Sequence, residues 1–138
     1  MYLIDTNVIS ELRKGDRTNA GVKAFFRDAD VTGAALFLSV ITVGELQRGV
    51  DLIAHRGDVA QARLLSKWLD QVLELYRNHI LDFSDVEARV WGRLRVPRPE
   101  NAIDKQIAAT ALTYDLTLVT RNVTDFEGTA VRLCDPFL

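Results

Sequence analysis

The chain has few of the residues that mark a disulfide-stapled or membrane-embedded protein. Its 138 residues include a single cysteine, Cys134, together with three prolines and eight glycines. One cysteine excludes an internal disulfide framework and suits a reducing compartment. No apolar run approaches the length of a membrane span, and no basic segment resembling a signal peptide opens the chain. We therefore expect a cytoplasmic protein that does not enter a membrane.

A large excess of charge of either sign is also lacking. The formal net charge is −2, which provides no general attraction for nucleic acid. Arginines account for 13 of the 17 basic residues. Arginine binds phosphates and carboxylates in a fork geometry, although it is also common on solvated helix faces. Apolar residues make up 48% of the chain and charged residues 26%, which is typical of one compact domain spanning residues 1–138.

Short apolar runs alternate along the chain with helical patterns. Strands are predicted over residues 1–4, 36–38, 79–83, 116–120 and 130–133. Helices are predicted over residues 8–12, 22–26, 40–50, 60–76, 84–94 and 103–113. Thr6 or Asn7 is the candidate cap of the first helix, and Ser84 opens the fifth through a capping box. This alternation predicts an α/β fold, a three-layer α/β/α sandwich with a mostly parallel central sheet.

Four carboxylates lie where a predicted strand ends or a predicted helix begins. Asp5 follows the first strand, Glu45 lies early in the third helix, Asp104 lies in the first turn of the last helix, and Asp125 follows the strand ending near Thr120. In an α/β fold these positions converge on one crevice at the carboxyl edge of the sheet. The four carboxylates are therefore candidates for one acidic site.

Each carboxylate also has an ordinary structural interpretation. Asp5 would cap the helix that follows it, and Asp104 would favour the positive end of its helix. Glu45 would lie on an exposed helix face, and Asp125 would be a turn residue. Gly44, just before Glu45, costs about 1 kcal/mol in a helix interior. The close approach of a ligand or of a second backbone would explain that glycine.

Electrostatic repulsion distinguishes a site from four unrelated acids. Two carboxylates about 5 Å apart repel by about 3 kcal/mol at an effective dielectric constant near 20. Three or four of them in one crevice must be protonated or must bind a cation such as Mg²⁺ or Mn²⁺. A metal ion held by carboxylates commonly acts on phosphates. A metal-dependent phosphate chemistry is therefore the first hypothesis.

Four motifs, in order along nearly the whole chain, resemble those of PIN-domain ribonucleases, specifically toxins of the VapC or FitB type. Each motif is weak alone, but the ordered set is specific. The motifs are Tyr2-Leu3-Ile4-Asp5-Thr6-Asn7-Val8, Ser39-Val40-Ile41-Thr42-Val43-Gly44-Glu45-Leu46-Gln47-Arg48-Gly49, Asp104-Lys105-Gln106-Ile107-Ala108-Ala109-Thr110-Ala111 and Leu118-Val119-Thr120-Arg121-Asn122-Val123-Thr124-Asp125-Phe126.

The resemblance implies a division of roles among these residues. Asp5, Glu45 and Asp104 would hold the divalent metal, Mg²⁺ or Mn²⁺, and would form the catalytic set together with Asp125. Relatives can carry an aspartate where this chain has Asn122, so either Asn122 or Asp125 completes the site, and the number of metals stays open. The expected substrate contacts come from Thr6, Asn122 and Arg121, although Arg121 is equally well explained as an ordinary surface arginine.

The resemblance also implies an activity and partners. The chain would be an endoribonuclease that cuts RNA phosphodiesters by metal-activated water and leaves a 5′-phosphate and a 3′-hydroxyl. A cognate antitoxin protein would restrain it and would supply the only contact with DNA. A homodimer is expected, with apolar residues of the helices over residues 8–12 and 43–50 as candidates for its interface or for the core.

Three other functions compete with this interpretation. A haloacid-dehalogenase-type phosphatase would need a second aspartate two residues after Asp5, where this chain has Asn7. A receiver domain would need an acidic pair after the first strand, which is not evident. The third alternative is a catalytically inactive PIN-like module acting within an antitoxin–DNA repressor complex. The three intact core acids oppose that alternative, and metal titration would separate it from the nuclease.

Overall fold

A five-stranded sheet forms the centre of the computed structural model, which describes residues 1–138. The strands are β1 (Tyr2–Ile4), β2 (Leu36–Ser39), β3 (Ile80–Leu81), β4 (Thr117–Val119) and β5 (Leu133–Cys134). They lie in the order β3-β2-β1-β4-β5, and every pair of neighbours is parallel. The predicted parallel sheet is confirmed.

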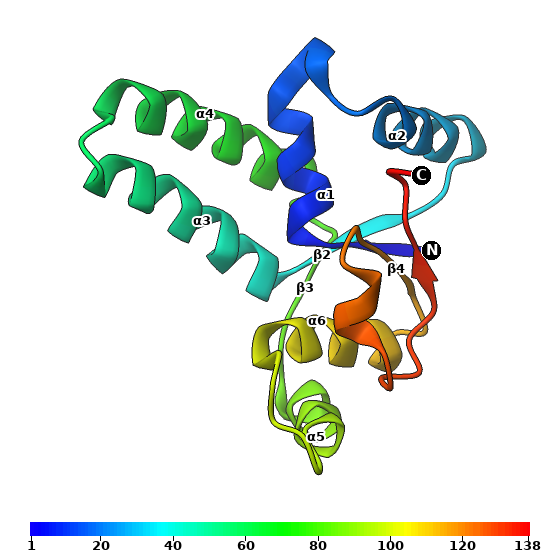
Figure 1. Cartoon of the computed structure of the whole chain (residues 1–138). Helices are drawn as coiled ribbons and strands as arrows, with labels where there is room; N and C mark the ends of the chain where they lie inside the picture. Colours follow the sequence, from blue (N-terminus) through cyan, green and yellow to red (C-terminus); the bar gives the residue numbers. More distant parts are fainter.

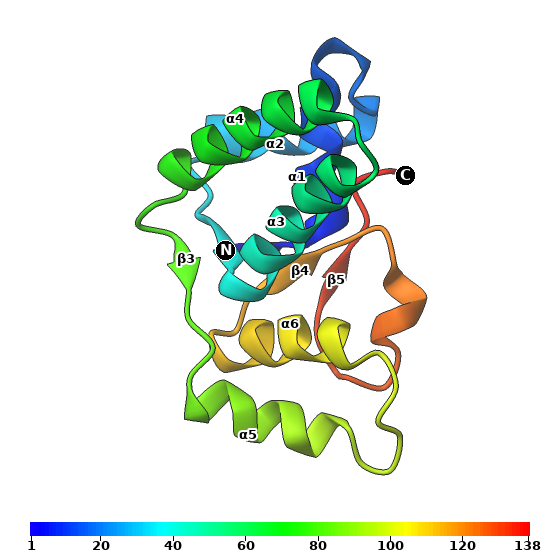
Figure 2. The same ribbon diagram turned by 90° about the vertical axis from the view of Figure 1, so that its left-hand side faces the viewer.

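Helices cover both faces of the sheet (Figure 1). One layer contains α1 (Thr6–Glu11), α2 (Ala20–Thr32), α3 (Val40–His55) and α4 (Val59–Leu75). The opposite layer contains α5 (Asp85–Leu94) and α6 (Ala102–Thr113), as the turned view in Figure 2 also shows. Two short 3-10 helices, η1 (Leu12–Arg17) and η2 (Val123–Phe126), complete the chain. The three-layer α/β/α arrangement is therefore confirmed, and no helix is both long and apolar enough to cross a membrane.

Successive strand residues face opposite layers, as the period of two in a β-strand requires. Leu3 of β1 and Leu118 of β4 pack with α6, whereas Ile4 and Val119 pack with α1 to α4. All four side chains are fully buried. The continuous apolar character of these strands thus reflects a sheet that is covered on both faces.

The strand order places a topological switch point between β1 and β4. From β1 the chain proceeds through β2 to β3 on one side, and it later returns to β4 and β5 on the other. Connections that leave neighbouring strands in opposite directions open a crevice at the carboxyl ends of those strands. Asp5 directly follows β1 and Thr120 directly follows β4, so both residues lie at this crevice.

Several helix boundaries differ from those predicted. α1 begins at Thr6 and its N-cap is Asp5, so the prediction of Thr6 or Asn7 as the cap was wrong. α3 continues five residues beyond the predicted end, to His55. α2 runs from Ala20 to Thr32 rather than over residues 22–26, and ends at Gly33 in the left-handed conformation. Its second half is largely polar and exposed, so the apolar pattern there was too sparse to predict a helix.

The last strand and the segment around Asp125 also differ from the predictions. β5 covers Leu133–Cys134 instead of residues 130–133, because Ala130 has a φ of 63°, which is incompatible with a strand. The predicted strand over residues 79–83 is reduced to two residues. Asp125, expected in a turn after the strand ending near Thr120, lies in the 3-10 helix η2.

The end of the chain packs tightly against the start of α2. A Cβ atom at Gly21 would lie 2.1 Å from the carbonyl oxygen of Pro136. Because that neighbour is backbone, the substitution Gly21→Ala has to displace the segment around Pro136 or the first turn of α2. We expect it to lower the free energy of unfolding by about 1–3 kcal/mol. Urea denaturation measures this loss, and Gly44→Ala, where an added Cβ meets nothing within 4 Å, is the control that should not destabilise.

Candidate functional site

An open cavity of about 250 Å³ lies at the carboxyl edge of the sheet. Its walls come from the end of β1, from the first turns of α3 and α6, and from the segment after β4. The lining residues are Asp5, Thr6, Asn7, Glu45, Ile103, Asp104, Ile107 and Asn122. We call this space the acidic cavity. Three of the four predicted carboxylates therefore face one cavity although they lie far apart along the chain.

The hydrogen bonds around Asp5 fix its carboxylate in place. Asp5 is buried, with 3% of its surface exposed. Its Oδ1 accepts a hydrogen bond from the backbone N–H of Thr6 at 2.8 Å. Its Oδ2 accepts one from the hydroxyl of Thr120 at 2.7 Å and one from the amide of Asn7 at 3.4 Å. Asp5 is thus both the cap of α1 and a wall of the acidic cavity, so its two interpretations do not exclude each other.

Thr120 is a site residue that the sequence did not predict to have a role. Its hydroxyl donates to Asp5 and accepts from the backbone N–H of Asn122 at 3.1 Å and from the Asn7 amide at 3.4 Å. Because Thr120 itself is fully buried, it holds three segments of the cavity wall together. Its place immediately after β4 at the switch point is the signal that could have identified it.

Two further polar contacts position the wall near α1 and α3. The hydroxyl of Thr6 donates to the hydroxyl of the buried Thr42 at 3.2 Å. The side-chain oxygen of Asn7 accepts from the backbone N–H of Arg121 at 3.1 Å. Thr6 lines the acidic cavity together with Asp5, and its hydroxyl is held by Thr42. Asn7 and Thr42 join the site as residues that orient their neighbours.

Burial and, to a smaller extent, repulsion by neighbouring carboxylates raise the pKa values of Asp5 and Asp104. Burial raises the pKa of Asp5, the hydrogen bonds from Thr120 and Thr6 lower it, and the charge of Glu45 raises it. Burial also raises the pKa of Asp104 to about 6, with further contributions from the charges of Asp5, Asp125 and Glu45. No hydrogen bond to a protein group compensates Asp104. The four predicted acids therefore form one electrostatic cluster.

The raised pKa of Asp104 makes the metal-free protein more stable in mild acid. The pKa of Asp104 is about 6 in the folded protein and 3.8 when the side chain is not buried, as in the unfolded chain. At a pH between these two values, Asp104 therefore binds a proton in the folded state but not in the unfolded state. The resulting stabilisation is complete below the unfolded value and is lost as the pH rises through about 6. With chelator present, we expect a higher melting temperature at about pH 5 than at about pH 7.5, and Asp104→Asn should reduce that difference. A difference as large in the variant would show that other groups cause it.

The remaining predicted residues lie at different distances from the acidic cavity. Asn122 lines it. Asp125 does not line it, but lies in the adjoining η2, and its charge raises the pKa of Asp104. The guanidinium of Arg121 lies over the ring of Phe137, 4.7 Å from the ring centroid, and Arg121 is not among the residues that line the cavity. The structure therefore brings Asn122 into the site, puts Asp125 beside it, and places the Arg121 side chain against the end of the chain.

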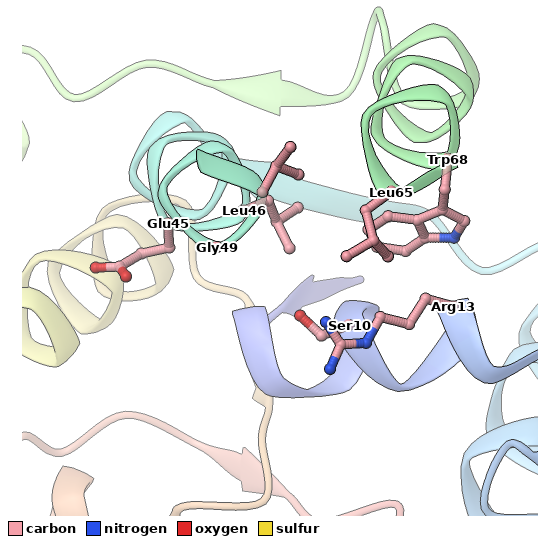
Figure 3. Close-up of a pocket in the computed structure, with 8 residues that line it drawn as sticks. Ser10, Arg13, Glu45, Leu46, Gly49, Leu65 and Trp68 are labelled. Atoms are coloured by element: carbon pink, nitrogen blue, oxygen red, sulfur yellow. The ribbon is translucent and has the colours of Figure 1, made fainter. Parts of the chain in front are cut away.

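Glu45 separates the acidic cavity from a smaller one. This second cavity, of about 50 Å³, lies between α1, α3 and α4 and includes Ser10, Arg13 and Trp68 in its wall. Figure 3 shows Glu45 extending from α3 towards α6, whereas Leu46 extends towards α1 and α4. The Glu45 carboxylate thus belongs to the acidic cavity. Gly44 is exposed and an added Cβ would touch nothing, so the expected approach of a second backbone at this glycine was wrong.

The donor groups of the acidic cavity suit a hard divalent cation. As the side chains stand, no three His, Cys, Asp or Glu residues already surround one point in a metal-binding arrangement. Mg²⁺ does not require this, because it keeps several waters and is commonly bound through one or two carboxylates. Asp5, Glu45 and Asp104 supply carboxylate oxygens, and Thr6 and Asn122 supply neutral ones, around a space large enough for a hydrated ion. These residues therefore fit Mg²⁺ or Mn²⁺ in chemistry.

A comparison with known protein families identifies the family of this chain. The family model described as the PIN domain matches residues 2–131. The chain belongs to the PIN-domain family. Toxin FitB of Neisseria gonorrhoeae is 32% identical over 99% of both chains. VapC ribonuclease Y4jK of Sinorhizobium fredii is 31% identical over 99% of this chain and 98% of its own.

Solved structures of toxin–antitoxin proteins contain chains similar to this one. The crystal structure of FitAcB from Neisseria gonorrhoeae contains a chain with a TM-score of 0.86 and 32% identity, and 99% of each chain is covered. A toxin–antitoxin complex from Klebsiella pneumoniae contains one with a TM-score of 0.70 and 25% identity, covering 99% of this chain and 98% of its own. The resemblance to VapC and FitB toxins is thus confirmed for this PIN-domain chain.

Proposed function

We propose that this PIN-domain chain is a metal-dependent endoribonuclease and the toxin of a toxin–antitoxin pair. The observation that carries the proposal is the convergence of Asp5, Glu45 and Asp104 on one cavity, with Asp125 close enough to raise the pKa of Asp104. Such a cluster is costly unless it serves a cation. The similarity to a VapC ribonuclease supports RNA as the substrate.

Asp5, Glu45 and Asp104 would hold Mg²⁺ or Mn²⁺, and Asp125 would act as an auxiliary acid. When bound, the ion would neutralise charge at the reacting phosphate and lower the pKa of a water molecule. The chain itself supplies orientation. Thr120, which does not itself line the cavity, holds the Asp5 carboxylate through its hydroxyl.

Substrate contacts would come from the neutral groups of the same wall. The Thr6 hydroxyl and the Asn122 amide lie at the acidic cavity and can hydrogen-bond phosphate or ribose oxygens without adding negative charge. Arg121 would have to leave the ring of Phe137 to reach the RNA. We therefore propose Thr6 and Asn122 as the nearer substrate contacts and Arg121 as an outer one.

A cognate antitoxin protein is the proposed partner, and it would provide any contact with DNA. The similar chain in the Klebsiella pneumoniae toxin–antitoxin complex supports this partner. Of the apolar residues considered for a homodimer interface, Val8, Ile9, Leu46 and Val50 are buried in the protein core. Leu12 and Val43 are only partly buried, so we propose them as the interface candidates that are left in these two segments.

Cleavage of a labelled total-RNA pool tests the proposal. We expect the purified protein to produce discrete fragments with Mg²⁺ or Mn²⁺. Chelator and the substitution Asp5→Asn should each abolish them. The absence of cleavage by antitoxin-free protein at every metal concentration would instead support a catalytically inactive module acting in a DNA-bound complex. Fragments that persist in chelator would point to a contaminating nuclease or to metal-free chemistry.

A further inference from the structure

A second polar space adjoins the acidic cavity. It has a volume of about 350 Å³ and lies between the α5–α6 loop, the start of α6 and η2. No apolar side chain lines it; its residues are Arg98, Glu100, Asn101, Lys105, Thr124, Asp125 and Glu127. We call it the polar cleft. Figure 2 shows the α5–α6 loop and η2 on the same side of the molecule, at the beginning of α6.

The polar cleft and the acidic cavity are lined by neighbouring residues of the same two segments, the start of α6 and the segment after β4. Asn101 lines the cleft and Asp104, one helical turn on, lines the cavity. Asn122 lines the cavity, and Asp125 lines the cleft. A chain-like ligand whose reacting group lies at Asp104 would therefore continue past Asn101 and Asp125 into the cleft.

The loop that forms one wall of the cleft is held by side chains from both adjoining helices. Lys105 Nζ donates to the carbonyl oxygen of Arg98 at 2.7 Å, and Arg95 Nε donates to that of Pro99 at 3.3 Å. Arg95 also stacks on Trp91, 4.6 Å from the ring centroid, and Trp91 Nε1 donates to the carbonyl oxygen of Ala102 at 2.9 Å. These contacts fix the backbone that presents Arg98 and Asn101.

The two side chains presented by this loop are not engaged by the protein. Arg98 is exposed, and none of the four ion pairs in the structure includes it. Asn101 precedes α6 in the left-handed conformation, with φ 56° and ψ 45°, and its side chain does not cap the helix. An unpaired guanidinium and an unused amide beside a held backbone form a ready set of donors for oxygen atoms.

The lining of the cleft indicates the chemical class of ligand. Protein partners bury an apolar core at an interface, and the polar cleft offers none. Glu100, Asp125 and Glu127 outnumber its two cations, so it has no general attraction for polyanions. Among the lining residues, Arg98 is a cation that forms no ion pair within the protein, so a single phosphate can lie at its guanidinium. The cleft therefore suits one phosphate and its ribose within a longer strand.

We propose that the polar cleft binds a phosphate and ribose of single-stranded RNA next to the phosphodiester that reacts in the acidic cavity. Arg98 binds the phosphate, and the Asn101 amide binds an adjacent phosphate or ribose oxygen. This inference rests on the proposed ribonuclease function and adds to it a second contact region on the substrate. The contact is to the backbone of the strand and so does not select bases.

Single-turnover cleavage of a labelled RNA that the wild type cuts tests this inference. With Mg²⁺ present, Arg98→Gln should raise the RNA concentration for half-maximal rate by about 3–10-fold and leave the maximal rate unchanged. Loss of one phosphate contact should also lower the slope of log affinity against log salt concentration by about 0.7. Asn101→Gly keeps the left-handed backbone and removes the amide, so it should weaken binding without changing that slope.

Arg89→Gln is the matched control, because Arg89 is an exposed arginine of α5 that does not line the cleft. If Arg98→Gln matches this control in both half-maximal concentration and salt slope while the wild type cleaves, the cleft does not bind RNA and the proposed ribonuclease function still holds. If the wild type does not cleave at all, both proposals are overturned. A fall in the maximal rate alone would overturn the binding role of Arg98.

Discussion

Asp104→Asn is expected to reduce RNA cleavage by about a thousandfold while it makes the metal-free protein more stable. The loss of activity follows because the variant removes one of the three carboxylates that we propose hold the metal in the acidic cavity. The gain in stability follows because burial, and after it the charges of Asp5, Asp125 and Glu45, oppose the charged form of Asp104. After allowance for solvent screening of this half-buried group, we expect about 1–2 kcal/mol at neutral pH.

Thermal melting in chelator and single-turnover cleavage in Mg²⁺ measure the two effects of Asp104→Asn on one protein preparation. Asp70→Asn is the control, because Asp70 is exposed on α4 and lies outside both polar cavities. It should change neither quantity. A melting temperature that falls in Asp104→Asn would show that the carboxylate stabilises the start of α6 and is not held in a repelling cluster.

Thr120→Val is expected to lower both the stability of the protein and its activity. The Thr120 hydroxyl is the strongest hydrogen-bond donor to Asp5 Oδ2, at 2.7 Å, and both residues are buried. Removing it leaves a buried carboxylate oxygen with only the 3.4 Å contact from Asn7. We expect a loss of about 1–3 kcal/mol in the free energy of unfolding. Cleavage should fall by about 10–100-fold because Asp5 loses its orientation.

The pH dependence of cleavage separates orientation of Asp5 from a general loss of structure. Because the hydrogen bond from Thr120 lowers the pKa of Asp5, its removal should raise that pKa and move the acidic limb of the pH–rate profile to higher pH. Thr120→Ser retains the hydroxyl and should restore both the profile and most of the rate. An unshifted acidic limb in Thr120→Val would mean that Thr120 supports only the fold.

The positions of the acidic residues could be predicted because local patterns determine them. A short apolar run ending in Asp5 indicates a buried strand with a carboxylate at its end, and the structure confirms that β1 ends at Ile4. The parallel sheet then follows from the alternation of strands and helices. Glu45 and Asp104 lie on the predicted helices and line the acidic cavity. Fold class and cluster were therefore accessible from the sequence.

The hydrogen bonds that position the cluster could not be predicted, because they join distant segments. Thr120 and Asp5 are 115 positions apart, and only the adjacency of β1 and β4 brings them into contact. The stacking of Arg121 on Phe137 depends in the same way on where the end of the chain packs. The conformation of Ala130, which shortens β5, also leaves no periodic signal in the sequence. Contacts set by tertiary packing thus account for most of the differences between the predicted and the observed structure.

Thermal melting with increasing Mg²⁺ or Mn²⁺ tests most directly whether the acidic cavity is a metal site. A ligand that binds only the folded protein stabilises it by about 2.7 kcal/mol at one hundred times its dissociation constant. We predict a saturable rise in the melting temperature of the wild type, reversed by chelator and absent or strongly weakened in Asp104→Asn. Equal responses of the wild type and Asp104→Asn, or no response in either, would contradict the assignment of Asp5, Glu45 and Asp104 as a metal centre.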